Sequence, residues 1–277
     1  MSLKDLLVYV DNDPACASRL QIAVALAASR EAHLAGLHVM VPSPLPGYLE
    51  AELPPAFYAE QERQLAERAR SAEARFREHA QREGVRHEWR VAEGSLISTV
   101  KLHARYADLT IVGQGVDLAD GPGELAFLPE ELALGVGRPV LVMPRYGTFE
   151  TVGERVLIAW NGSREATRAV HDAMPLLAGA KTVTVLSIDP PDDGRAGRLP
   201  GADIALHLAR HGIQAEASVT HAIDISVGDV LLSAAADRSA DLIVMGAYGH
   251  SRVREMVLGG VTRHLLQHMT VPVLMSH

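Results

Sequence analysis

The chain of 277 residues has little of several features that mark particular classes of protein. Cys16 is its one cysteine, which excludes an intrachain disulfide framework and any CxxC metal or redox motif. No apolar run approaches the roughly 18 residues needed to cross a bilayer, and the first residues lack a basic segment followed by a long apolar core. We therefore expect a soluble, cytoplasmic protein without a membrane partner.

Basic runs and aromatic residues are also scarce. The formal net charge is −8 and no long basic segment is present, which disfavours a nucleic-acid partner. Aromatic residues make up 4% of a chain that is 48% hydrophobic, so the cores are expected to be aliphatic. The length suits two small α/β domains better than one compact domain.

The two halves of the chain repeat one plan. The segments DLLVYVDNDPACASRLQIAVALAA and RVLIAWNGSREATRAVHDAMPLLA each read as an apolar strand, a polar turn and an amphipathic helix. Further on, ADLTIVGQG matches ADLIVMGAYG, and RPVLVMP matches VPVLMSH. The segment PRYGTFETVGE is the natural linker between the halves. We expect two tandem domains over residues 1–146 and 153–277.

Each half is expected to alternate strands and helices. Short runs rich in Val, Ile and Leu, separated by helical patterns, indicate a parallel sheet that is covered on both faces. The expected fold class is α/β, with two tandem doubly wound domains that each hold a five-stranded parallel sheet flanked by helices. The strands are expected near residues 6–10, 34–40, 85–91, 109–112 and 140–143, and near 156–160, 183–188, 214–220, 242–245 and 273–275.

A glycine-rich segment, GAYGHSRVREMVLGGVT, follows the fourth strand of the second half and spans residues 246–262. Ligands bind at the carboxyl ends of strands in such sheets, and glycine lets backbone N–H groups converge on an anion. A helix beginning near Gly260 would add its N-terminal dipole. The segment therefore predicts a phosphate cradle, and the alternative is a tight strand-to-helix connection with a close helix–sheet contact. It is neither a Walker loop nor a dinucleotide fingerprint.

The spacing G-x2-G-x9-G, ending in GGVT and followed by HMTVPVL, closely resembles the universal stress protein family. The resemblance covers both halves, and nucleotide-binding members of the family hold ATP. It implies ATP, with or without Mg²⁺, as the ligand of the second half. The implied phosphate and ribose contacts are Gly246, Gly249, Gly259, Gly260, Val261 and Thr262, and the implied adenine-side residues are Ala159, Asn161, Ile188 and Met245.

Two positions depart from the family pattern. Gly260 stands where Ser or Thr is usual, which removes a hydroxyl donor, and Asn161 stands where Asp is usual. Trp160 lies beside the implied site and either stacks on a base or fills the pocket. Histidines 264 and 268 have a spacing that can hold a metal, but no third ligand is evident, so we interpret them as surface or core residues.

The first half keeps Asp11 at the adenine-side position but not the glycine loop. Val116 aligns with Gly249, Ala126 with Gly259, and Phe127 with Gly260. These side chains, and the acidic segment DLADGPGE, oppose a bound triphosphate by volume and charge. We expect no ATP in this half.

The leading functional hypothesis is a stress-response regulatory protein that binds an adenine nucleotide through its C-terminal domain. The alternative is a nucleotide-independent interaction or dimerisation module of the same fold. An ATP-consuming enzyme is a weaker reading, because no general base, P-loop lysine or metal-binding carboxylate pair accompanies the loop, so any hydrolysis is expected to be slow. The resemblance also implies a homo-oligomer or an intramolecular pseudo-dimer in which two separate sheets meet through the final strands PVLVM and PVLMS.

Overall fold

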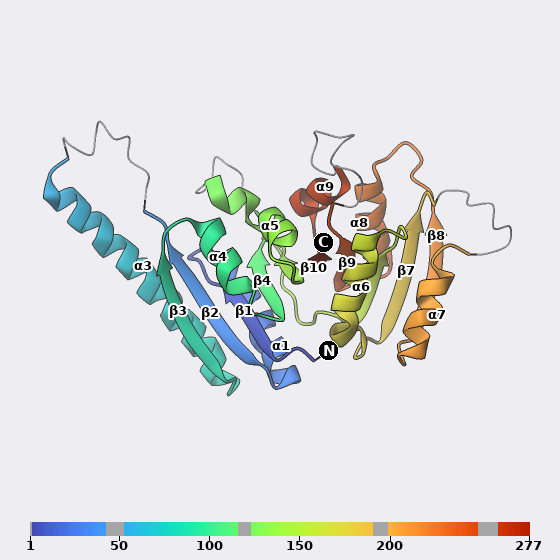
Figure 1. Cartoon of the computed structure of the whole chain (residues 1–277), viewed down its shortest axis with the longest axis horizontal. Helices are drawn as coiled ribbons and strands as arrows, with labels where there is room; N and C mark the ends of the chain where they lie inside the picture. Colours follow the sequence, from blue (N-terminus) through green and yellow to red (C-terminus); the bar gives the residue numbers. More distant parts are fainter. Residues whose placement is uncertain (1, 43–52, 116–122, 191–198, 249–259) are drawn as a thin grey trace.

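The computed structural model describes residues 2–42, 53–115, 123–190, 199–248 and 260–277. Strands and helices alternate along both halves (Figure 1). The first half contains β1 (Asp5–Tyr9), α1 (Cys16–Arg30), β2 (His33–Met40), α3 (Pro55–Arg82), β3 (His87–Glu93), α4 (Leu96–Ala104), β4 (Leu109–Gly113), α5 (Gly123–Gly135) and β5 (Val140–Met143). The second half contains β6 (Arg155–Ala159), α6 (Arg164–Leu177), β7 (Thr182–Ile188), α7 (Ala202–Arg210), β8 (Ala215–Thr220), α8 (Val227–Asp237), β9 (Leu242–Gly246), α9 (Gly260–His268) and β10 (Val273–Ser276).

Each half has the strand order of a doubly wound sheet. The first half runs β3-β2-β1-β4-β5 and the second runs β8-β7-β6-β9-β10, with parallel neighbours inside each half. All ten expected strands are present, with their ends shifted by at most two residues. The predicted fold class is confirmed.

The two halves form one continuous sheet, so the expectation of two separate sheets is wrong. Strands β5 and β10 pair antiparallel, with Leu274 opposite Leu141 and Val273 opposite Val142, and the result is a ten-stranded sheet. Both strands are short and apolar, and each would otherwise leave a row of backbone N–H and C=O groups unpaired at an edge. Pairing the two edges satisfies those groups and joins the halves.

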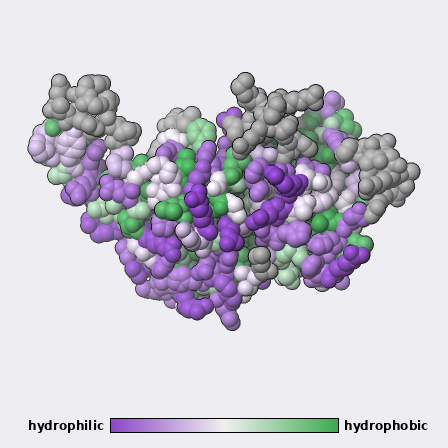
Figure 2. Space-filling model, in the orientation of Figure 1, coloured by the Kyte–Doolittle hydropathy of each residue, from purple (hydrophilic) through white to green (hydrophobic). Residues whose placement is uncertain are grey.

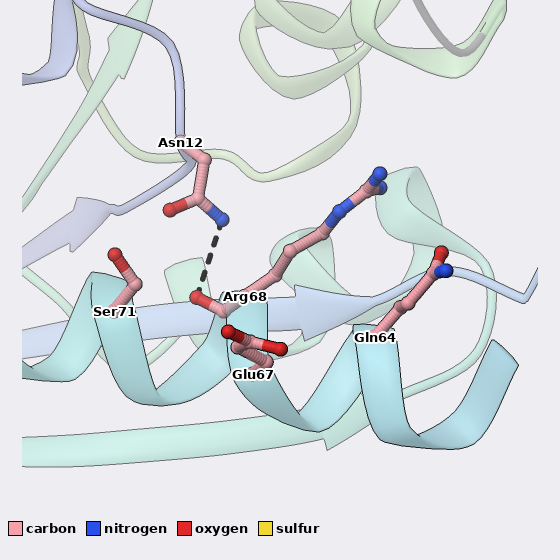
Figure 3. A pocket seen from close by; sticks show the side chains of 5 residues that line it. All are labelled: Asn12, Gln64, Glu67, Arg68 and Ser71. Atoms are coloured by element: carbon pink, nitrogen blue, oxygen red, sulfur yellow. Dashed lines mark hydrogen bonds between the residues drawn. The ribbon is translucent and has the colours of Figure 1, made fainter. Parts of the chain in front are cut away.

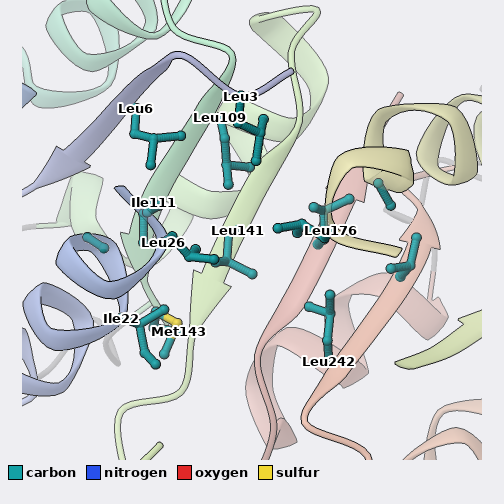
Figure 4. Close-up of a cluster of buried hydrophobic side chains, with 14 of the residues drawn as sticks. Leu3, Leu6, Ile22, Leu26, Leu109, Ile111, Leu141, Met143, Leu176 and Leu242 are labelled. Atoms are coloured by element: carbon teal, nitrogen blue, oxygen red, sulfur yellow. The ribbon is translucent and has the colours of Figure 1, made fainter. Parts of the chain in front are cut away.

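Helices cover both faces of this sheet, and each face has one hydrophobic core. Helices α1, α3, α6 and α7 pack on one face, and α4, α5, α8 and α9 pack on the other. Because strand side chains alternate between faces, Leu6 and Leu7 enter different cores. Figure 4 shows the first core continuing from Leu141 of β5 to Leu176 and Leu242 of the second half. The junction between the halves is therefore buried on both sides.

The segment between β5 and β6 is held by the carboxylate of Asp241, which precedes β9. Asp241 is 9% exposed and accepts hydrogen bonds from the Thr151 hydroxyl at 2.7 Å and from the backbone N–H groups of Gly153, Glu154 and Arg155 at 3.1, 3.0 and 2.8 Å. A buried carboxylate needs several donors of this kind. Asp241 thus fixes the point where the chain enters the second half.

The described part of one face of the molecule is mostly hydrophilic (Figure 2). Figure 2 shows hydrophilic side chains over most of the described part of one face, with smaller hydrophobic areas between them. Across the described residues, no helix combines the length and the apolar character needed to cross a membrane.

Candidate functional site

The carboxyl ends of β6 and β9 define the candidate site, because the strand order reverses between these two strands. Ala159 ends β6 and lies opposite Met245 of β9, and Ile188 ends the neighbouring β7. Ala159 and Ile188 are partly buried against the second core, whereas Met245 is 6% exposed. The structure therefore brings the three expected adenine-wall residues to one edge of the sheet.

Asn161 lies in the turn that leads from β6 into α6. Its Oδ1 accepts the backbone N–H of Ser163 at 3.1 Å, and the Ser163 side chain in turn caps α6 by accepting the N–H of Ala166. The Asn161 side chain is exposed, and its Nδ2 donates to no partner within the described residues. The amide N–H₂ is the end of this side chain that is available to a ligand.

Trp160 precedes Asn161 and is partly buried. Its ring packs against the first core, and its backbone N–H donates to Leu186. Trp160 therefore contributes to packing at the edge of the site.

Two of the expected loop glycines have different surroundings. A Cβ on Gly246 would lie 2.5 Å from the Ala166 nitrogen and 2.8 Å from the Glu165 Cβ, so a close approach of α6 requires glycine there. This is the close helix–sheet contact given as the alternative interpretation. A Cβ on Gly260 would meet no described atom within 4 Å. Packing among the described residues therefore leaves open space at Gly260.

The first turn of α9 carries the remaining described positions of the predicted cradle. Val261 is 36% exposed, whereas Thr262 is 4% exposed and its Oγ1 accepts a long hydrogen bond of 3.5 Å from the backbone N–H of Tyr248. Tyr248 has a positive φ of 58°, which is uncommon for a residue other than glycine. This hydrogen bond thus connects Tyr248, before the glycine loop, with Thr262, after it. Gly249 and Gly259 lie outside the described residues.

The matching edge of the first half is filled by its own side chains. Arg19 of α1 is 3% exposed and pairs with the Asp11 carboxylate at 2.8 Å. A side chain on Gly113, at the end of β4, would collide with this guanidinium. Burial alone would lower the pKa of Arg19, but the neighbouring Asp11 and Cys16 together outweigh burial and the pKa is raised. The guanidinium is therefore a permanent cation at this edge.

Tyr9 fills the same edge of the first half. It aligns with Ala159, is 4% exposed and lies with its ring centre 5.9 Å from the Arg19 guanidinium carbon. Burial, and then the nearby Asp11 carboxylate, raise the pKa of the Tyr9 hydroxyl. Where the second half presents a methyl group, the first half has a buried aromatic ring.

Helix α5 replaces part of the loop in the first half. Ala126 and Phe127 lie within α5, whereas the aligned Gly260 is the first residue of α9. Glu124 of α5 accepts the N–H of Leu96 at 2.5 Å and the Ser95 hydroxyl at 3.0 Å, so its carboxylate occupies the N-terminus of α4. Val116 lies outside the described residues.

Sequence reasoning attributed the difference between the halves to Val116, Ala126 and Phe127, and it missed Arg19. The available signal was an arginine on the apolar face of α1, next to Cys16, Leu20 and Ala23, all of which are buried. An arginine in such a stripe needs a buried counter-charge, and the Asp11 carboxylate supplies it.

A polar pocket of about 340 Å³ lies away from the predicted site (Figure 3). It lies between the turn after β1 and helix α3, and its lining residues are Asn12, Gln64, Glu67, Arg68 and Ser71. Asn12 Nδ2 donates to the backbone oxygen of Arg68 at 3.2 Å, which is the dashed contact in Figure 3. The pocket is thus open, mixed in charge and separate from the glycine loop.

The histidines of α9 pack with each other and with α8. The rings of His264 and His268 stack with their centres 4.3 Å apart, and Nε2 of His264 lies 2.8 Å from Oδ1 of Asp229. Within the described ranges, no group of three His, Cys, Asp or Glu side chains is arranged to hold a metal ion.

The fold agrees with comparisons to known proteins. The universal stress protein family matches the chain twice, over residues 2–116 and 153–277. The chain belongs to the universal stress protein family, and it carries two copies of the family domain in tandem.

Individual relatives match the chain at low sequence identity. Universal stress protein Slr1230 of Synechocystis sp. is 28% identical over 171 residues, a match that spans 60% of this chain and 57% of that protein. The crystal structure of a universal stress protein from Archaeoglobus fulgidus is 15% identical, with a TM-score of 0.75 over 98% of this chain and 97% of the other. A putative universal stress protein from Pseudomonas aeruginosa is 16% identical, with a TM-score of 0.58 over 99% of this chain and 93% of the other. The two structures share the fold of the whole tandem chain.

Proposed function

We propose that the second half binds an adenine nucleotide, ATP with or without Mg²⁺, and that its occupancy regulates the protein in a stress response. The nucleotide lies at the carboxyl ends of β6 and β9, with the base near Ala159 and Ile188 and the phosphates at the glycine loop. Nucleotide binding biases the protein between conformations or partners.

The main support for this proposal is the difference between the strand-end edge of the first half and the equivalent edge of the second half. In the first half Tyr9 and Arg19 fill the edge, whereas the aligned residues of the second half are Ala159 and Ala169. Ala159 remains partly exposed at the strand end, and Gly260 leaves open space at the start of α9. One edge is closed by its own side chains, and the other offers apolar walls and a helix N-terminus.

Hydrolysis is expected to be slow in this proposal. The glycine loop has no Walker lysine. Turnover should fall well below the ~10 s⁻¹ typical of dedicated enzymes. Steady-state phosphate release at ordinary enzyme rates, abolished by a loop substitution, would contradict a regulatory role.

Calorimetry with ATP on the intact chain tests the proposal, and we expect one site per chain. Gly249→Val copies the first-half residue onto the second half and should weaken binding at least about tenfold, which corresponds to ~1.4 kcal/mol. Circular dichroism should show that the variant keeps its fold.

Val116→Gly is the matched control, because it restores the loop glycine to the first half. It should add no second site, since Tyr9 and Arg19 still fill that edge. Two sites in the unaltered chain, or unchanged affinity in Gly249→Val, would show that the loop has been misread. A folded chain that binds no adenine nucleotide would favour the nucleotide-independent interaction module.

A further inference from the structure

Gln114 belongs to the first half, but its side chain holds a helix of the second. It follows β4, and its Nε2 donates to the backbone oxygens of Leu266 at 2.8 Å and Gln267 at 3.0 Å. Its Oε1 accepts the backbone N–H of Arg145 at 3.0 Å. Because both carbonyls need a donor and Arg145 needs an acceptor, this network fixes the orientation of the amide.

The two carbonyls belong to the last turn of α9, where they have no partner within the helix. The last four C=O groups of any α-helix lack such partners, and α9 has only nine residues. Isolated helices of this length are marginal in water. The Gln114 amide therefore stabilises the helix whose first turn carries Gly260, Val261 and Thr262.

Helix α5 of the first half also interacts electrostatically with α9. Glu130 of α5 is 9% exposed, and burial raises the pKa of its carboxyl, an effect that the nearby Arg263 of α9 opposes. The same carboxyl lies near Tyr248, whose pKa is raised first by burial and then by Glu130. Figure 1 shows α5 and α9 at the middle of the molecule, where the halves meet. The first half thus binds the last turn of α9 through Gln114 and interacts electrostatically with Arg263 through Glu130.

The Gln114 contact has no counterpart at the aligned position of the second half. In the repeat Gln114 aligns with Ala247, which is fully buried and has no polar side chain to offer to α5. A contact needed only to join the halves could be symmetric. The asymmetry of this contact matches the difference between the two strand-end edges. The first half supplies the Gln114 amide, and its own edge is filled by side chains. The second half receives the amide, and its edge is open.

We propose that Gln114 is a positioning residue for the nucleotide site of the other half. The first half has no nucleotide of its own and holds α9 in the orientation in which the start of the helix meets the phosphates. This rests on the proposed function, in which the second half binds an adenine nucleotide.

The test compares Gln114→Ala and Gln114→Glu in the full chain by hydrogen exchange and by ATP calorimetry. Gln114→Glu keeps the acceptor for Arg145 but loses both donors, and it places a negative charge at the C-terminal end of the α9 dipole. Amide exchange at residues 264–268 should accelerate at least about fivefold in both variants. ATP affinity should fall about five- to tenfold, and Gln114→Glu should show the larger loss.

Gln214→Ala is the control, because it removes an exposed glutamine just before β8. It should change neither measurement. Unchanged exchange in α9 would overturn the role of Gln114 in holding the helix, and faster exchange with unchanged ATP affinity would overturn its role in positioning the site. If the unaltered chain binds no ATP, the proposed function fails, and exchange alone then decides whether Gln114 holds α9.

Discussion

At the scale of single residues, the buried pair of Arg19 and Asp11 separates the two halves most sharply. The Arg19 side chain is 3% exposed and Asp11 is 17% exposed, so removing one partner leaves a charge without compensation. We predict that Asp11→Ala lowers the free energy of unfolding by about 3–5 kcal/mol, measured by urea denaturation.

The double variant Asp11→Ala, Arg19→Met is the control for this prediction. It removes both charges and keeps an apolar side chain of similar length, so it should recover much of the loss. Equal destabilisation in the single and double variants would show that the lost stability comes from packing rather than from the unpaired guanidinium.

A second residue-scale prediction concerns His207, which lies between two other imidazoles. Its ring centre is 4.8 Å from that of His211 and 5.2 Å from that of His171. Burial, and then His211, His171 and Arg210, lower the pKa of His207 below its ordinary 6.5. The unfolded chain therefore takes up this proton first, and stability contributed by the neutral ring is lost as the pH falls below about 6.5.

His207→Gln should reduce the loss of stability between pH 7.5 and pH 5.5, measured as the shift in the urea midpoint. The exposed His221, whose Nδ1 lies 3.1 Å from an Asp189 oxygen, supplies the comparison variant His221→Gln. A pH dependence that both variants share with the unaltered chain would be inconsistent with a role for the imidazole cluster.

At the scale of elements, Asp241 connects the inter-half segment to the start of β9. Its carboxylate accepts four hydrogen bonds, three of them from backbone N–H groups of the segment that leads into β6. We predict that Asp241→Ala destabilises the chain by at least about 2 kcal/mol, because several donors lose their partner at a buried position. Urea denaturation measures the effect. Asp237→Ala, at the exposed end of α8, should change stability little.

Local sequence predicted the strands and the start of α9, but not how the two halves join. Most of the strands were found from runs of apolar residues, because a strand buried on both faces carries that signal in its own sequence. The edge strands β3 and β8 are partly exposed and carry a weaker signal. The start of α9 at Gly260 was found from the glycine pattern in the same way. The pairing of β5 with β10 was missed, because two short apolar strands can pack or pair, and nothing within either strand distinguishes the two outcomes.

Some of the site residues could also be assigned from the sequence, and others could not. Ala159, Ile188 and Met245 were assigned from the resemblance to the family, and in the structure they lie at the carboxyl ends of β6, β7 and β9. Gln114 and Glu130 could not be found in this way, because their partners lie in the other half of the chain and depend on how β5 meets β10. Contacts across the junction are a property of the assembled sheet.

At the scale of the whole molecule, the continuous sheet and its shared cores predict that the two halves unfold together. The chain has two tryptophans, with Trp89 in β3 of the first half and Trp160 after β6 of the second. The variants Trp160→Phe and Trp89→Phe therefore each leave one fluorescent reporter, one for each half. In urea, the two reporters should show the same midpoint, and circular dichroism should coincide with both.

A core substitution confined to one half makes this last test decisive. Leu20 of α1 is fully buried in the first half, and Leu20→Ala should cost about 2–5 kcal/mol. Because β5 and β10 are neighbours in one sheet, loss of the first half exposes the β10 edge and the cores on both of its faces. The midpoint reported by Trp160 in the second half should therefore fall together with that reported by Trp89. A Trp160 midpoint that stays in place while the Trp89 midpoint falls would show that the halves are independent folding units.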